Sequence, residues 1–305
     1  MSKAGTLQPD PTMIGDVAEP PFARLPDPIV LFSTRAERFR TLAESHELGP
    51  YLRFLAALSD CQHRIQDGLP EPDMPADDVR ARAREHAMPP LDRSRFTADA
   101  ALDATLDRMF SLAAAIDMPV SAREALERAS QADASARDGM VRAVLDEAIP
   151  VEAFADHVFV AAALQVHFAR MASRLDAKAL VPIGEGACPS CGAAPVASAI
   201  VGWQGAHGAR FCTCSLCATQ WHVVRVKCVL CDSTKGIAYQ EIDGASPNVK
   251  AETCENCHGY VKILHQHKEP ALEPVADDVA TLGLDLLLRE SGYRRGAVNP
   301  FLLGY

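Results

Sequence analysis

Four Cys-x-x-Cys pairs within residues 188–257 constrain this 305-residue chain more than any other feature. The pairs are Cys188/Cys191, Cys214/Cys217, Cys228/Cys231 and Cys254/Cys257. The last two pairs repeat the first two at a constant offset of 40 residues, and Arg210 matches Lys250 at the same offset. The chain therefore contains a duplicated module in which 22 residues separate the two pairs.

Two Cys-x-x-Cys knuckles at such a separation are typical of a tetrahedral metal site with four cysteine ligands. An interleaved pairing of the first knuckle with the third is the alternative, but the duplication favours sequential pairing, because each copy is then a complete unit. We therefore predict a first site and a second site that fill independently of each other. The predicted ligands are Cys188, Cys191, Cys214 and Cys217 in the first site, and Cys228, Cys231, Cys254 and Cys257 in the second.

The spacing of the knuckles fits zinc as well as iron, because both ions accept four thiolates in a tetrahedron. A site closed by four cysteines leaves no open position for a substrate or an activated water, which argues against metal-assisted hydrolysis. The sequence also lacks a Gly-rich phosphate loop, a G-x-S-x-G motif and an H-E-x-x-H motif. These observations predict a protein that is not an enzyme.

The remaining cysteines and two histidines near the knuckles are predicted to have structural roles. Cys212 aligns with Glu252 in the repeat, so a buried or partly exposed thiol is favoured over an alternative ligand or a redox thiol. Cys61 is expected on the face of an amphipathic helix. His265 and His267 follow the last knuckle at strand spacing and are expected at a solvated strand end.

The chain divides into five segments, and the predicted fold class is α+β. Residues 1–28 contain six prolines and are expected to form a mobile arm. Residues 29–180 show helical periodicity and predict an α-helical domain. Two small β modules follow, at residues 181–227 and 228–270, with strands expected at Gln220–Val226 and Gly259–Leu264. Residues 271–305 are expected to form a C-terminal helix and a docked tail. The other expected helices are Ala98–Ile116, Ser121–Arg128, Ala136–Ala148, Val151–Leu175 and, near the C-terminus, Ala276–Glu290.

Charge and hydropathy restrict the classes of partner. The formal net charge is −10, and residues 181–270 contain seven basic and seven acidic side chains. Proteins that capture nucleic acid carry an excess of Lys and Arg instead, so no nucleic acid is expected as a partner. No apolar run approaches the roughly 20 residues of a membrane span, and residues 1–20 do not resemble a secretory signal. We therefore expect a cytoplasmic protein without membrane insertion.

Taken together, these motifs resemble the FdhE family of formate dehydrogenase accessory proteins. The matching stretches are CPSCGAAPVAS (188–198), CSLCATQWHVVRVKCVLC (214–231), AETCENCHGYVKIL (251–264) and DDVATLGLDLLLRESGYRRGAVNPFLL (277–303). The resemblance implies a cytoplasmic factor that is required for active respiratory formate dehydrogenase. This factor contacts the catalytic subunit of the enzyme before the subunit is exported. It also implies two rubredoxin-like modules, each binding one iron ion through its four cysteines.

The sequence departs from rubredoxin knuckles at one kind of position. Rubredoxin knuckles usually have Gly after the second Cys. Here only the first knuckle does, with Gly192, and the other three positions are occupied by Ala218, Asp232 and His258. Two other functions remain as alternatives, a rubredoxin-like electron carrier and a zinc-ribbon protein that binds nucleic acid. The charge balance disfavours the second of these.

Overall fold

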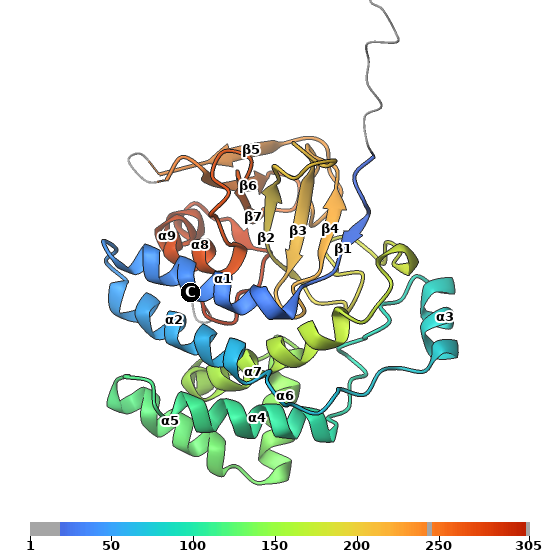
Figure 1. Ribbon diagram of the computed structural model, residues 1–305. Coiled ribbons are helices and arrows are strands. Elements are labelled where there is room, and N and C mark those ends of the chain that lie inside the picture. The colour runs from blue at the N-terminus through green and yellow to red at the C-terminus, as the bar shows by residue number, and fades with distance from the viewer. Residues whose placement is uncertain (1–18, 243–245, 303–305) are drawn as a thin grey trace, which may run out of the picture.

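A computed structural model describes residues 19–242 and 246–302 and shows a helical half packed against a β-sheet (Figure 1). Its long helices all show an apolar face or are buried almost all round, which is what drives them together. The helices of the first half are α1 (Pro28–Ala43), α2 (Gly49–Arg64), α3 (Asp77–Glu85), α4 (Ala100–Ala113), α5 (Val120–Gln131), α6 (Ala134–Leu145) and α7 (Phe154–Ala172). Short 3-10 turns lie at Val151–Ala153 and Ala177–Ala179.

Helix α7 lies at the centre of the helical half and contacts α4, α5 and α6. Its sequence FADHVFVAAALQVHFARMA is apolar on nearly every face, which suits a helix surrounded by others. Helix α3 is the opposite case. Its sequence DDVRARARE has no apolar stripe and no buried residue, so hydrophobic periodicity did not predict it. It lies at the outer margin of the molecule (Figure 1).

The strands of both predicted modules form one continuous sheet and not two separate ribbons. The strands are β1 (Ala23–Arg24), β2 (Pro195–Ile200), β3 (Arg210–Cys214), β4 (Gln220–Val223), β5 (Ile237–Gln240), β6 (Val249–Cys254), β7 (Gly259–Leu264) and β8 (Arg294–Arg295). Their order is β1-β4-β3-β2-β7-β6-β5, and β8 pairs with β7. The first module contributes β2–β4 and the second β5–β7, and the two meet where β2 and β7 pair in parallel.

Residues 1–18 of the predicted mobile arm lie outside the described part of the chain, and the rest of that segment is ordered against the sheet. Ala23 and Arg24 form β1, which pairs with Trp221 and Gln220 of β4. The backbone N–H of His222 also donates to the Phe22 carbonyl at 2.8 Å. Without β1, strand β4 would expose its unpaired backbone groups at the edge of the sheet.

The C-terminal helix expected over 276–290 is two helices, α8 (Pro274–Ala280) and α9 (Leu282–Glu290), separated at Thr281. The buried Lys262 ammonium of β7 explains the break. It donates to the carbonyls of Asp278 and Thr281 at 2.7 and 3.1 Å, so a side chain enters the backbone hydrogen bonding where the two helices meet. In the C-terminal tail, Phe301 and Leu302 are buried, and residues 303–305 lie outside the described part of the chain.

Buried ion pairs join the helical half to the C-terminal helices. Arg35 of α1 donates to the Glu273 carboxylate, and Arg38 donates to Asp277 with two nitrogens. A single hydrophobic core runs through this contact, from Phe32 of α1 to the cysteines of the first module. The helices and the sheet therefore form one packed body.

Candidate metal centres

The eight cysteines expected as ligands gather into two clusters, and the knuckles pair sequentially. Cys188, Cys191, Cys214 and Cys217 form the first cluster, and Cys228, Cys231, Cys254 and Cys257 form the second. Within each cluster the four sulfur atoms lie within 4.8 Å of one another. The interleaved alternative does not fit this geometry, because each cluster draws all its cysteines from one copy of the repeat.

The sulfur positions fit a tetrahedral ion. Bonds of about 2.3 Å from one ion to four thiolates separate neighbouring sulfurs by about 3.8 Å. In the second cluster two sulfur–sulfur distances across the knuckles, Cys228–Cys257 and Cys231–Cys254, are both 3.8 Å. In the first cluster the equivalent distances are 3.6 and 3.4 Å. Each cluster could hold a zinc or an iron ion with little adjustment, since the two ions form similar bonds to thiolates.

The first cluster is buried because the helical half covers its knuckles. The backbone N–H groups of Leu91 and Arg93 donate to the carbonyls of Ser190 and Cys191, at 2.8 and 3.1 Å. On the other knuckle, the side-chain amide of Gln165 on α7 donates to the Ser215 carbonyl at 2.8 Å. All four sulfurs of this cluster are consequently shielded from solvent.

The second cluster lies nearer the free edge of the sheet and is partly open. Cys228 and Cys254 are buried, whereas Cys231 and Cys257 are half-buried. The Asn256 side-chain amide, itself exposed, donates to the Cys231 sulfur at 3.5 Å. The two copies of the repeat therefore present the same four ligands to solvent very differently.

The electrostatics of the first cluster favour a bound cation. Burial raises the pKa of the Cys188 and Cys191 thiols well above that of an ordinary cysteine, so these groups are neutral unless a positive charge lies beside them. The backbone N–H groups of Leu216 and Cys217 point at the Cys214 sulfur at 3.4 and 3.3 Å, an arrangement that stabilises a thiolate. A metal ion would supply the missing charge and keep all four sulfurs deprotonated.

All four knuckles impose a left-handed backbone on the residue after the second cysteine. The φ angles are +79° at Gly192, +58° at Ala218, +66° at Asp232 and +52° at His258. Glycine adopts this conformation without steric cost, whereas other L-residues are disfavoured there by roughly 1–2 kcal/mol. The three departures from the glycine pattern therefore keep the knuckle geometry and store strain in it.

Replacing His258 by glycine is expected to raise the free energy of unfolding of the metal-loaded protein by about 1 kcal/mol, because the left-handed strain is removed. His258 is exposed, so little packing is lost with the side chain. His207→Gly is the matched control: His207 is also exposed, but its φ is not positive, so this glycine only adds freedom to the unfolded chain. Urea denaturation measures both. Equal effects of the two substitutions would contradict the strain at position 258.

The other residues singled out in the sequence lie outside the two clusters. Cys212 is buried in β3, where burial raises its thiol pKa to about 12, and Cys61 is buried in α2. His265 and His267 follow the end of β7 as expected and are half-buried. They pack at the junction of the modules, where the His267 backbone N–H donates to the Ile200 carbonyl at 3.0 Å. Burial there lowers the pKa of His265 to about 4.

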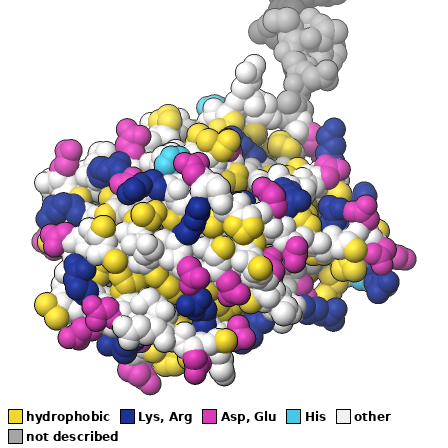
Figure 2. Space-filling view, turned by 60° about the horizontal axis from the view of Figure 1, so that its bottom comes forward, with side chains coloured by type: hydrophobic (Ala, Val, Ile, Leu, Met, Phe, Trp, Pro, Cys, Tyr) yellow, Lys and Arg dark blue, Asp and Glu magenta, His cyan; other side chains and the backbone are white. Residues whose placement is uncertain are grey.

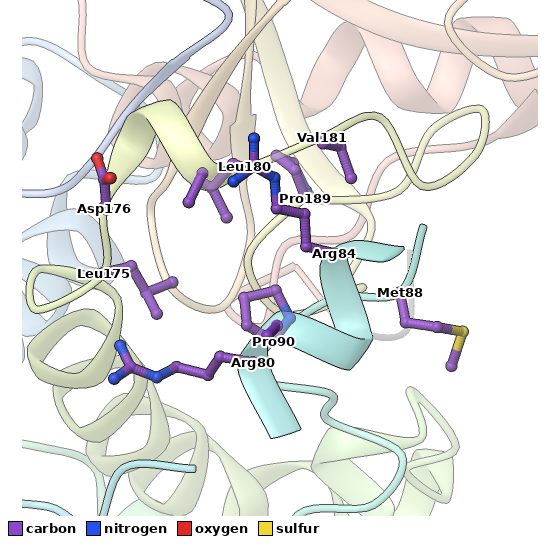
Figure 3. Close-up of a pocket in the computed structure, with 11 residues that line it drawn as sticks. Arg80, Arg84, Met88, Pro90, Leu175, Asp176, Leu180, Val181 and Pro189 are labelled. Atoms are coloured by element: carbon purple, nitrogen blue, oxygen red, sulfur yellow. The ribbon is translucent and has the colours of Figure 1, made fainter. Parts of the chain in front are cut away.

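A cavity of about 160 Å³ lies beside the first cluster, between α3 and the end of α7 (Figure 3). Arg80 and Arg84 of α3 line one side, and Leu175 and Leu180 line the other. The one carboxylate in its wall, that of Asp176, accepts the backbone N–H of Lys178. Its lining therefore pairs no nucleophile with a base, and it offers no catalytic constellation.

The molecular surface shows no block of one charge on the face in Figure 2, where acidic and basic side chains alternate between apolar ones. Among the described residues, no helix is both long enough and apolar enough to cross a membrane.

Comparisons with known proteins agree on one family. Three family models match consecutive parts of the chain: FdhE, N-terminal (residues 20–185), FdhE, central domain (187–225) and FdhE, C-terminal domain (226–302). The FdhE homologue of Rhizobium meliloti is 46% identical over 302 residues and that of Stutzerimonas stutzeri 37% over 305, in both cases over 98% of each chain. The crystal structure of the FdhE protein from Pseudomonas aeruginosa superposes with a TM-score of 0.83 at 33% identity, covering 93% of this chain and 99% of that one. The chain therefore belongs to the FdhE family.

Proposed function

We propose that this protein is a non-catalytic accessory factor for respiratory formate dehydrogenase, which binds the catalytic subunit of that enzyme in the cytoplasm. Its two four-cysteine clusters each hold one iron ion, with zinc as the alternative. The ions close the knuckles and thereby fix the shape of the sheet. The observation that carries the proposal is the pair of closed four-thiolate clusters in a chain of the FdhE family.

Closed clusters support binding and not catalysis. A tetrahedron completed by four protein thiolates has no ligand position to offer a substrate. When bound, the ion supplies positive charge that holds the thiolates together. The knuckles and the strands that follow them are then a preformed surface for a protein partner. Short segments such as these gain on the order of 10 kcal/mol of folding free energy from a structural ion, so the surface depends on the metal.

A role in electron transfer is the second candidate, and the exposure of the second cluster favours it. Cys231 and Cys257 bring two sulfur ligands of that site to the surface, where a redox partner can approach. Metal analysis with a visible spectrum tests this second candidate, which requires iron, whereas the accessory role is compatible with either metal. Ferric iron in four thiolates is red and bleaches on reduction, whereas a zinc-loaded protein is colourless and cannot carry electrons.

The test of the accessory role is capture of the formate dehydrogenase catalytic subunit by the purified, anaerobically prepared protein. We expect two metal ions per chain, specific capture of the subunit and no oxidation of formate by the protein alone. A variant with all eight ligand cysteines replaced by serine should lose capture and should not restore formate oxidation to cells that lack the native protein. His207→Gly is the matched surface control and should behave as wild type. Full capture and full rescue by the metal-free variant would contradict the proposed role of the clusters.

A further inference from the structure

We infer that the buried Arg210–Glu252 ion pair positions the second four-cysteine cluster, so that its closure depends on the folded first module and the two clusters fill in order, the first before the second. This inference rests on the proposed metal binding and adds to it an order of loading and the residues that impose it.

The Arg210 guanidinium lies on β3 of the first module and reaches across the junction into the second. It donates to both carboxylate oxygens of Glu252 on β6, at 2.8 and 3.0 Å, and both side chains are almost completely buried. The Ser198 hydroxyl on β2 accepts two further bonds from Arg210, at 3.1 and 2.9 Å. A two-pronged pair in a low-dielectric interior fixes direction as well as distance, because both bonds must align together.

The groups held by Arg210 lead directly to ligands of the second cluster. Glu252 is two residues before Cys254 on the same strand. One of the guanidinium nitrogens also donates to the backbone carbonyls of Arg225 and Lys227, at 3.4 and 3.2 Å, immediately before Cys228. One side chain of the first module therefore fixes the approach of the chain to both knuckles of the second.

Comparison of the two copies of the repeat shows that a residue of the first module positions the second, whereas the equivalent residue of the second module does not position the first. The counterpart of Arg210 in the second module is Lys250, which forms a partly exposed pair with Glu241, a residue of its own module. The counterpart of Glu252 is Cys212, a buried thiol and not a carboxylate that could pair with a cation of the second module. The first cluster is held instead by the helical half, through Leu91, Arg93 and Gln165.

An order of filling follows without breaking thermodynamic reciprocity. If a filled first cluster strengthens binding at the second, a filled second cluster strengthens the first by the same factor. The order comes from the unequal starting affinities. The first cluster is preorganised by the helical half, whereas the second is preorganised only when the first module presents Arg210.

The experiment measures zinc release from the zinc-loaded protein to a chromogenic chelator. Two phases are expected, and the Cys254→Ser/Cys257→Ser variant identifies the second-cluster phase by its loss. Arg210→Met combined with Glu252→Gln removes both charges, so neither partner is left buried alone. We expect this variant to accelerate the second-cluster phase by about 10-fold to 100-fold, the size of effect found when groups that orient metal ligands are removed. The first-cluster phase should change by less than about 2-fold, because its hydrogen bonds to Leu91, Arg93 and Gln165 are not altered.

The control is Arg137→Met with Asp107→Asn, which removes an Arg–carboxylate pair between α6 and α4 within the helical half. It should leave both phases unchanged. Ser198→Ala gives a second, milder variant that keeps both charges and should accelerate the second-cluster phase in the same direction. An unchanged second-cluster phase in both variants, or an equal acceleration by the control, overturns the inference while the metal centres stand. Wild-type protein with fewer than two zinc ions per chain overturns the proposed centres themselves.

Discussion

Replacing Cys214 and Cys217 by serine is expected to unfold the whole β-sheet, whereas the same change at Cys254 and Cys257 should unfold only the edge that contains β5 and β6. The first cluster lies between the helical half and the central strands β2 and β3, and its sulfurs are shielded from solvent. Loss of its ion would forfeit on the order of 10 kcal/mol of folding free energy and leave buried serine hydroxyls in place of metal ligands.

The two variants are compared by metal content, circular dichroism and regional hydrogen exchange. The Cys214→Ser/Cys217→Ser variant should retain its helices, lose both ions and lose protection throughout the sheet. The Cys254→Ser/Cys257→Ser variant should retain one ion and protection in β2, β3 and β4. The continuous sheet is the reason for expecting this difference, whereas the repeat alone predicts that the two sites fill independently. Equal losses of protection in the two variants would contradict the unequal roles of the clusters.

Replacing Lys262 by methionine is expected to lower the free energy of unfolding by about 3–5 kcal/mol, because it leaves buried carboxylates without one of their two cations. The Lys262 ammonium lies 3.2 Å from Asp278 and 2.5 Å from Asp285, and all three side chains are almost fully buried. Arg295 is the other cation of this network and pairs with the same two carboxylates.

The network also predicts how stability depends on pH. Burial alone would raise the pKa of Asp278, but Arg295 and Lys262 outweigh it, and the pKa is lowered in the folded protein. The pKa of an unfolded Asp is about 3.9. The contribution of Asp278 is therefore complete above that pH and is lost as the pH falls through the lower folded value. In Lys262→Met the loss should begin at a higher pH, because one of the two cations that lower this pKa is gone.

Urea denaturation across pH 3–8 measures both effects of the Lys262 substitution. Lys250→Met is the control, because Lys250 lies on a strand of the same module but forms a partly exposed pair, typically worth less than about 1 kcal/mol. Adding Asp285→Asn to Lys262→Met should recover part of the lost stability, since one unpaired buried charge is removed. A loss from Lys262→Met no larger than that from Lys250→Met would show that the network does not hold the C-terminal helices.

The sequence alone determined which cysteines gather in each cluster. A Cys-x-x-Cys knuckle is a local structure, and a repeat of 40 residues shows which two knuckles belong to one copy. Strand β7 was predicted with both of its ends, and the helices around α4 to α7 within several residues, because apolar periodicity is also a local property. Helix α3 was missed for the same reason, since its side chains are mostly polar and carry no periodic signal.

Only the tertiary structure decided how the two copies differ. The four cysteines have the same spacing in both copies, but they are shielded from solvent in the first copy and partly exposed in the second. The reason is that α7 and the segment after α3 cover the knuckles of the first copy and not those of the second. The parallel pairing of β2 with β7, the break at Thr281 and the Arg210–Glu252 pair were equally absent from the local pattern. Each of them depends on contacts between residues that are well separated in the chain. Their energy arises from burial and from charges brought together by folding, and no single segment carries either.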